Sequence, residues 1–375
     1  MKHTCKFVPG FLAAMAVFGL LLVAGCQMAS DQVARIKHAV PPDGVLLRGA
    51  GATFPSEIYK RWFELYQKQN PKTVVEYDAV GSGEGVRRFV GVNLDPGEQV
   101  EFGASDAAMN DADIARTKDG ALMIPMTAGS VALAYNLPNF NGQLKLSRQA
   151  YIGILLGKIK QWNDPAIRRT NPEINLPNLT ISTVVRSDAS GTTFALTKHL
   201  DAVSPQWRSQ YGAATLVNWP GNAMRAKGNE GVAAMIKRSE GAIGYVGYDF
   251  ARKVGLRVAW LENQDGKFVP PLAANASAAL AGTNLPENLR SFVTDPAGAD
   301  SYPIVTMSWI LVHRQYSNAA TARALRELFA WTLSPQAQQM ARDLEYVPLP
   351  AAVTEKSLAA LQQVKSNDAS GATIR

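Results

Sequence analysis

The sequence predicts an α/β protein built around mixed sheets. Segments typical of strands and of helices alternate along the chain, and this order favours sheets with helices packed against them. The composition is that of an ordinary globular protein, with 47% hydrophobic and 18% charged residues. A chain of 375 residues is long enough for two or three domains or for one bilobal unit.

The predicted elements follow from local patterns of apolar residues, turn residues and prolines. In chain order they are a helix after Pro55, strand 73–80, helix 85–90, strand 178–187, helix 192–200, helix 230–238, strand 241–248, strand 302–313 and helix 316–343. The last helix is expected to break near Ser334 and Pro335, because proline interrupts helical hydrogen bonding.

The N-terminus is typical of an export signal. Lys2 and Lys6 precede an apolar run at 11–24, which is shorter than the about 20 residues of a membrane span. The run ends in LVAGC, which resembles the lipobox of bacterial lipoprotein signal peptides. We therefore expect cleavage after residue 25 and lipidation of Cys26. The alternative is simple cleavage with Cys26 left free.

The expected mature chain has no thiol for a disulfide. Cleavage removes Cys5, lipidation uses Cys26, and the sequence contains no other cysteine. This suits a protein exported to an oxidising space whose core is large enough without cross-links. Residues 26–43 are expected to form a flexible lipidated tether ending in Pro41 and Pro42. No second apolar run approaches membrane-span length, so the remaining body is expected to be soluble and tethered.

Positive charge is dispersed along the chain. Removing Lys2 and Lys6 with the signal lowers the formal net charge from +7 to +5. Because no long basic block remains, a solvated surface is favoured over nucleic-acid binding.

The stretch GAGATFP at 49–55 predicts a glycine turn that leads into a helix. The following residues place apolar side chains on one helical face: Ile58, Trp62, Leu65 and Tyr66. Pro55 is expected at the first helical position and Thr53 near the N-cap. A helix start presents free N–H groups and the positive end of the helix dipole, which favour an anion.

Two further turns repeat this pattern directly after predicted strands. Ser82 lies between glycines before one helix, and Ser190, Gly191 and Thr192 precede another. Hydroxyl groups donate to anion oxygens, and glycine allows backbone amides to approach closely. Three such turns together indicate an oxyanion site.

Three charged residues lie among these turns. Arg186 ends a predicted strand and can offer a fork of donors to an oxyanion, and Asp188 can hold that fork in place. Asp106 would repel an anion unless the anion carries a proton that the carboxylate accepts. Phosphate near neutral pH is protonated and sulfate is not, so the pattern favours a protonated oxyanion.

Seven motifs in order resemble the periplasmic phosphate-binding protein of the high-affinity phosphate ABC transporter. They are GAGATFP, GSGEGV, FGASDA, GKIKQWNDPAI, RSDASGTTF, KGNEGVAAMI and GAIGYVGY. The resemblance runs from about Leu46 to Pro350. It implies a type II periplasmic binding protein, with two α/β lobes joined by two crossover strands and a ligand cleft between them. The expected lobes are residues 44–127 plus 304–375, and residues 128–303.

The resemblance also implies a non-catalytic receptor that delivers phosphate to a membrane permease. It implies a monomer that holds phosphate without metal or cofactor. The residues at the matching positions are Thr53, Phe54, Ser82, Asp106, Arg186, Ser190, Gly191 and Thr192, with Asp188 supporting Arg186. Glu84 departs from the family pattern, which often has a second serine in this loop, and we expect its side chain to turn away from the anion.

Other functions remain as alternatives. The four histidines, His3, His38, His199 and His313, show no metal-ligand spacing, and no hydrolase or nucleotide-binding motif is present. An enzyme using Ser82 or Ser190 as nucleophile is therefore disfavoured. Arsenate is protonated like phosphate and stays open as a ligand, and a surface lipoprotein used mainly for phosphate sensing stays open as a role.

Overall fold

The computed structural model describes residues 40–140, 142–283 and 285–367. The predicted signal peptide, lipidation of Cys26 and most of the tether lie outside these residues. The described residues from Pro42 to Asn367 form a single unit.

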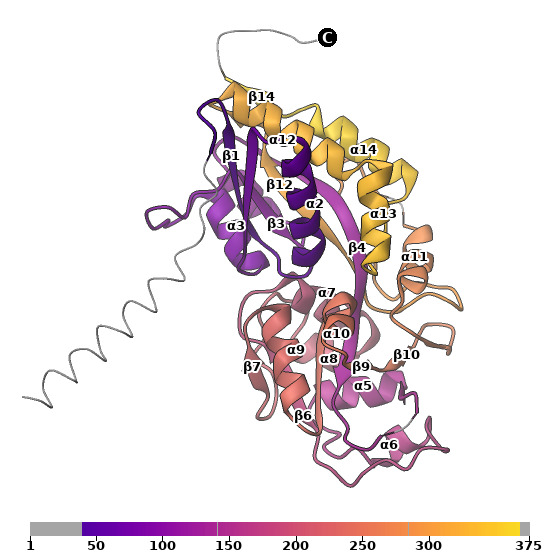
Figure 1. Cartoon of the computed structure of the whole chain (residues 1–375). Coiled ribbons are helices and arrows are strands. Elements are labelled where there is room, and N and C mark those ends of the chain that lie inside the picture. Colours follow the sequence, from indigo (N-terminus) through magenta and orange to yellow (C-terminus); the bar gives the residue numbers. More distant parts are fainter. Residues whose placement is uncertain (1–39, 141, 284, 368–375) are drawn as a thin grey trace, which may run out of the picture. The chain divides into compact units, whose positions relative to one another are not determined.

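The centre of this unit is a curled mixed sheet (Figure 1). Its strand order is β2 (Thr73–Ala79), β1 (Val45–Gly51), β3 (Phe102–Ser105), β12 (Val305–His313), β4 (Ala121–Tyr135), β8 (Ala242–Gly247), β6 (Ser182–Arg186) and β7 (Met224–Ala226). Strand β9 (Arg257–Val258) also pairs with β4. Parallel pairs lie toward both edges, and antiparallel pairs of β12, β4 and β8 lie between them. The predicted α/β class with a mixed sheet is therefore confirmed.

Strand β4 joins the two halves of this sheet. Its residues 121–130 pair with β12, whereas Val131–Tyr135 pair with β8. We call β1, β2, β3 and β12 the first half of the sheet, and β6, β7, β8 and β9 the second half. All fifteen residues of β4 are buried, since other elements cover both faces.

Thirteen helices lie among the described residues. They are α2 (Ser56–Gln69), α3 (Ser82–Val90), α4 (Asp111–Arg116), α5 (Arg148–Leu155), α6 (Pro165–Arg168), α7 (Gly191–Val203), α8 (Pro205–Gln210), α9 (Gly228–Arg238), α10 (Tyr248–Lys253), α11 (Ala273–Ala281), α12 (Ala319–Thr332), α13 (Pro335–Asp343) and α14 (Ala351–Leu361). Short strands complete the fold: β5 (Lys145–Leu146), β10 (Trp260–Glu262), β11 (Phe268–Val269), β13 (Gln315–Tyr316) and β14 (Lys365–Ser366). Near the C-terminal end, α12 and α14 pack on β1 and β4.

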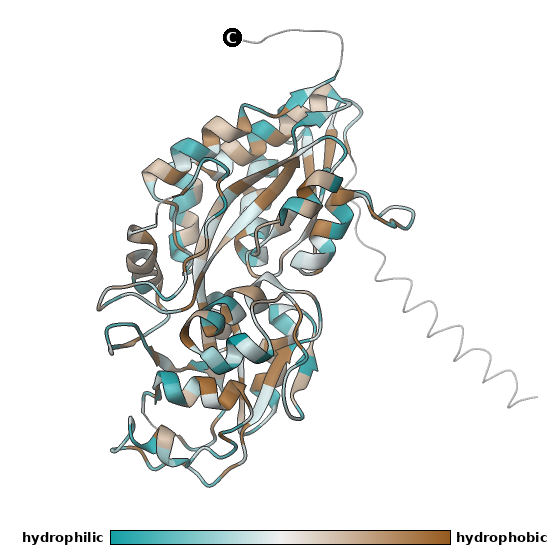
Figure 2. Ribbon diagram, turned by 180° about the vertical axis from the view of Figure 1, so that it is seen from behind, coloured by the Kyte–Doolittle hydropathy of each residue, from teal (hydrophilic) through white to brown (hydrophobic). Residues whose placement is uncertain are grey.

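Hydropathy follows this arrangement (Figure 2). Brown, apolar residues concentrate in the strands, whereas the helices show both brown and teal faces. One large apolar core runs through both halves of the sheet, and a smaller cluster around Val184 and Phe250 lies under α9 and α10. A helix that presents one apolar stripe to a sheet is what the sequence periodicity predicts.

Several predicted boundaries need correction. Only Ser182–Arg186 of the segment predicted as a strand at 178–187 form a strand, β6, because the pairing with β8 begins at Ser182. The glycine turn at 81–85 is already helical from Ser82. The predicted break in the C-terminal helix is confirmed, since α12 ends at Thr332 and α13 begins at Pro335.

The start of α2 also differs from the prediction. Pro55 precedes the first helical residue, Ser56, and no side chain caps the helix. The Thr53 hydroxyl is not a cap, because it bonds to a distant residue described below. The predicted apolar face is present, with Trp62 fully buried and Leu65 only partly buried.

Gly85 lets α3 lie directly on the first half of the sheet. A Cβ at this position would lie 2.4 Å from the Cα of Gly51 and 2.8 Å from the carbonyl oxygens of Ala50 and Ala104. Backbone atoms cannot rotate away, so Gly85→Ala is expected to lower the free energy of unfolding by about 1–3 kcal/mol. Gly282→Ala is the control, since its Cβ would meet nothing within 4 Å. Denaturant melts in which both variants match the wild type would contradict this packing.

Candidate anion-binding site

The structure brings the predicted site residues together at the ends of strands from both halves of the sheet. Thr53 and Phe54 follow β1, Ser82 begins α3 after β2, and Asp106 follows β3. From the second half, Arg186 ends β6 and Ser190–Thr192 begin α7. All of these residues are buried, and the polar ones among them are at most 3% exposed. A strand that ends in a glycine turn before a helix places its last residues at this edge.

Ser82 connects the two halves of the site. Its Oγ accepts hydrogen bonds from the amides of Asp106 at 3.2 Å and Gly191 at 3.1 Å. The neighbouring amide of Gly83 donates to the carbonyl of Ala189 at 3.0 Å. The turns before α3 and α7 therefore contact each other directly, although more than 100 residues separate them in the sequence.

Asn229 forms a second connection, which the sequence reasoning missed. It is fully buried, and its Nδ2 donates to Thr53 Oγ1 at 2.9 Å and to Thr192 Oγ1 at 3.2 Å. Its Oδ1 accepts from the amide of Gly247 at 2.9 Å. This network holds the hydroxyls of Thr53 and Thr192 in fixed positions. The only hint of Asn229 in the sequence was its place inside the motif KGNEGVAAMI.

Arg186 and Asp188 form the predicted pair. Arg186 Nε donates to Asp188 Oδ1 at 2.8 Å, and its Nη2 donates to Oδ2. The amide of Gly228 also donates to Asp188, at 3.1 Å, and Tyr245 OH accepts from the amide of Arg186. Burial raises the pKa of Asp188, but the hydrogen bond and charge of Arg186 and the backbone amides of Gly228 and Asp188 together outweigh it, so the pKa lies below its usual value.

The guanidinium of Arg186 keeps one donor unused. Its side chain is 2% exposed, and Nη1 is buried with no hydrogen-bond partner among the described residues. A buried charged donor without a partner is costly, so an anion at this point would satisfy it. The fixed ion pair holds the other two nitrogens and so sets the direction in which Nη1 is offered.

Asp106 is a buried carboxylic acid in the same site as Arg186 and Ser82. Its Oδ1 accepts from Ser308 Oγ at 2.8 Å, and its carbonyl accepts from Thr306 Oγ1 at 3.0 Å. Burial raises the pKa of Asp106 to about 7, although the hydrogen bond from Ser308, the charge of Arg186 and the Ser82 hydroxyl each lower it. Near neutral pH this carboxyl can therefore either accept or supply a proton.

Ser308 and Thr306 were also missed by the sequence reasoning. Both lie on β12, inside a run of apolar residues that reads only as a buried strand. They reach Asp106 because β12 pairs with β3 in the sheet, a pairing that the sequence does not reveal. Their hydroxyls hold the Asp106 side chain and backbone.

Backbone amides add further donors. Within the described part of the chain, the amides of Thr53 and Phe54 donate no hydrogen bond, and both lie at the N-terminal end of α2. Free amides at a helix start attract an anion through the helix dipole. Together with Arg186 Nη1, they give the site unsatisfied donors from both halves of the sheet.

The side chain of Glu84 pairs with two arginines of its own helix, α3. Its carboxylate accepts from Arg87 at 2.7 Å and from Arg88 at 2.8 Å, and its side chain is 30% exposed. The hydrogen bond from Arg87, with that from Arg88, lowers the pKa of Glu84 to about 2. Its charge is therefore matched by arginines of its own helix, not placed among the buried donors.

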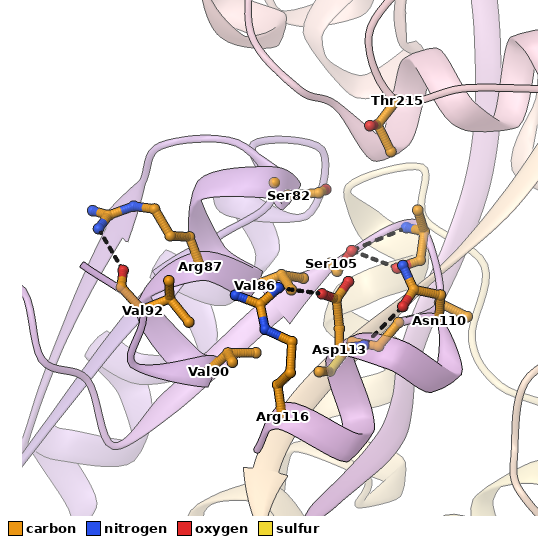
Figure 3. A pocket seen from close by; sticks show the side chains of 14 residues that line it. Ser82, Val86, Arg87, Val90, Val92, Ser105, Asn110, Asp113, Arg116 and Thr215 are labelled. Atoms are coloured by element: carbon orange, nitrogen blue, oxygen red, sulfur yellow. Dashed lines mark hydrogen bonds and ion pairs between the residues drawn. The ribbon is translucent and has the colours of Figure 1, made fainter. Parts of the chain in front are cut away.

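A pocket of about 290 Å³ lies beside Ser82 (Figure 3). Residues of α3 and α4 line it, and Thr215 reaches it from the other side. Asp113 and Arg116 line it as an ion pair at 3.5 Å. The pocket shares Ser82 and Gly83 with the candidate site and so adjoins it.

Within 40–140, 142–283 and 285–367, no group of three or more His, Cys, Asp and Glu side chains is placed to hold a metal ion. In the same residues no helix combines the length and apolar character needed to cross a membrane.

Comparison with known proteins gives consistent matches. The model of a PBP superfamily domain matches residues 31–336. The phosphate-binding protein PstS of Pasteurella multocida is 38% identical over 326 residues, covering 86% of this chain and 92% of that protein. The phosphate-binding protein PstS of Methanocaldococcus jannaschii is 32% identical and covers 96% of each.

Solved structures share the fold. A high-affinity periplasmic phosphate-binding protein (PfluDING) with bound phosphate superimposes with a TM-score of 0.70 at 22% identity, covering 84% of this chain and 93% of that chain. A putative phosphate ABC transporter substrate-binding protein from Clostridium perfringens, also with bound phosphate, gives a TM-score of 0.59 at 15% identity, with 82% and 100% covered. At these identities the likeness concerns the fold alone.

Proposed function

Because the chain belongs to the PstS family of phosphate-binding proteins, within the PBP superfamily, we propose that it binds inorganic phosphate for import by an ABC transporter. The observation that carries the proposal is that Arg186 and Asp106 are buried in the same site. A buried guanidinium with an unused donor and a buried carboxyl with a pKa of about 7 lie close enough for their charges to interact. A protonated oxyanion satisfies both groups, since it accepts from one and shares a proton with the other.

We propose that the anion contacts the groups predicted from the sequence. Arg186 Nη1, the free amides of Thr53 and Phe54, and the hydroxyl of Ser82 are the donors. The N-terminal turn of α7 adds contacts from Ser190, Gly191 and Thr192. Asp106 shares the proton of the anion, and Asp188 holds Arg186. Affinity then comes from matched hydrogen bonds, because Asp188 already balances the charge of Arg186.

Closure of two lobes is part of the proposal. We assign residues 44–127 plus 304–375 to the first lobe and 128–303 to the second. The contacts of Ser82 with Gly191 and of Thr53 with Asn229 cross this boundary, which supports a closed arrangement. Phosphate would stabilise this arrangement by binding it more tightly than an open one.

The remaining assignments follow from the N-terminal sequence and the family. We propose a non-catalytic, monomeric receptor outside the cytoplasmic membrane, anchored by a lipid on Cys26. Its partner is the transmembrane permease of a phosphate ABC transporter, and it needs neither metal nor cofactor. A receptor for arsenate or a lipoprotein used mainly in phosphate sensing would share this site chemistry.

Calorimetric titration of the purified protein tests the proposal. We expect saturable binding of phosphate with one site per chain, and sulfate at the same concentration should give no heat at pH 8. Arsenate is a second arm, because its protonation resembles that of phosphate. No phosphate heat, or equal affinity for sulfate, would contradict the assignment.

A further inference from the structure

Asp249 is a second buried carboxylic acid, outside the group predicted to contact the anion. It lies at the start of α10, directly after β8, and is 9% exposed. Its Oδ2 lies 2.6 Å from the hydroxyl of Tyr346, a residue that follows α13. The same hydroxyl lies 2.8 Å from the carbonyl oxygen of Phe54. Three segments that are distant in the sequence therefore meet at one phenol oxygen.

The Tyr346 phenol has only one proton to share between these two contacts. The Phe54 carbonyl can only accept a hydrogen bond, and the phenol has one proton to give. Burial raises the pKa of Tyr346 well above 10, so the phenol keeps that proton. If the phenol donates to Phe54, its contact with Asp249 at 2.6 Å needs a proton on the carboxyl group. If Asp249 were ionised, the phenol would donate its proton to the carboxylate instead. The buried carbonyl of Phe54 would then have no hydrogen-bond donor.

The surroundings favour the neutral acid. Burial raises the pKa of Asp249 to about 8, opposed by the hydrogen bond with Tyr346 and the amide of Phe250, and the charge of Glu57 raises it further. The nearby cations are engaged elsewhere, since Lys253 pairs with Glu57 at 2.7 Å and Arg252 with Glu345 at 3.2 Å. Among the described residues, no cation forms an ion pair with Asp249.

Phe54 is held on several sides by this group. Its ring meets the Tyr346 ring edge-on, with centroids 5.8 Å apart. A Cβ on Gly129 or on Gly247 would lie 3.0 Å from the same ring, so the ring is packed between β4 and the end of β8. With ring and carbonyl both fixed, the amide of Phe54 has little freedom to turn.

We propose that Asp249 is a positioning residue for the phosphate site, whose neutral carboxyl acts through Tyr346 to hold Phe54 and its free amide toward the anion. This inference rests on the proposed phosphate-binding function. Ionisation of Asp249 draws the phenol proton away from Phe54 and loosens the residue. Phosphate affinity is therefore expected to fall as the pH rises above about 8, for a reason separate from the titration of phosphate itself.

The test compares the wild type with Asp249→Asn over pH 6.5 to 9.5, using calorimetric titration with inorganic phosphate. An asparagine amide can donate to the phenol at every pH, so the ratio of the two affinities isolates the effect of Asp249. We expect this ratio to be constant below pH 7 and the wild type to lose about two- to tenfold relative to the variant by pH 9.5. Tyr346→Phe should weaken binding by a similar factor already at pH 7.

Thermal melts without phosphate give a second readout. The folded pKa of about 8 exceeds the usual 3.8, so the unfolded chain loses this proton first and the stability contributed by Asp249 declines from about pH 4 to pH 8. The melting temperature of Asp249→Asn relative to that of the wild type should therefore rise between pH 4 and pH 8. Above pH 8 the difference should stay constant. A ratio of affinities that stays flat to pH 9.5 would overturn this inference alone. Absence of phosphate binding by the wild type would overturn the proposed function as well.

Discussion

Replacing Arg186 with alanine is expected to weaken phosphate binding by about 30-fold or more. Removing one partner of a buried, hydrogen-bonded charge pair costs about 2–5 kcal/mol, and the change also removes the unused donor Nη1. The carboxylate of Asp188 would then stand unpaired beside the anion and repel it. Calorimetric titration with phosphate measures the loss.

Two controls separate this effect from a general loss of structure. Arg208→Ala removes an exposed arginine of α8 that pairs weakly with Asp201, and it should leave the affinity unchanged. The double variant Arg186→Ala, Asp188→Ala should recover part of the loss, because the repelling carboxylate is gone. Phosphate affinity of Arg186→Ala within twofold of the wild type would show that this guanidinium does not bind the anion.

Asp106→Asn is expected to reduce the preference for phosphate over sulfate by at least about tenfold at pH 8. In the wild type at this pH, Asp106 is mostly ionised, and burying it beside a fully deprotonated anion costs several kcal/mol. An asparagine amide carries no charge and can donate to a sulfate oxygen. Competition of sulfate against bound phosphate, measured for both proteins, gives the ratio.

The same carboxyl predicts a pH dependence for the wild type. Below its pKa of about 7, Asp106 holds a proton of its own and can donate it to sulfate, so discrimination should shrink as the pH falls from 8 to 5. The variant should show no such trend, and Asp201→Asn should behave as the wild type. Sulfate binding that is independent of pH in the wild type would rule out this role for Asp106.

The sequence indicated most of the site because its groups lie in short motifs at strand ends. A glycine turn before a helix is a local feature, and Ser82 and Thr192 could be read from it. The pairing of Arg186 with Asp188 is also local, since a single residue separates them. Local patterns cannot say which turns meet, and here the resemblance to a family supplied that information.

The residues that were missed act over long distances in the chain. Ser308 lies 202 residues from Asp106, and Asn229 lies 176 residues from Thr53. Each lies in a segment whose pattern indicates only a strand or a helix. The Thr53 hydroxyl was taken for a helix cap for the same reason, because its actual partner, Asn229, is remote. Tertiary pairing decides such contacts, and periodicity carries no information about it.

A crystal structure of the protein grown with phosphate would show directly which groups hold the anion. We expect one enclosed phosphate whose oxygens lie within hydrogen-bond distance of Arg186 Nη1, the amides of Thr53 and Phe54, and a carboxylate oxygen of Asp106. A phosphate bound elsewhere, or one in this site with Asp106 turned away from it, would contradict this binding mode.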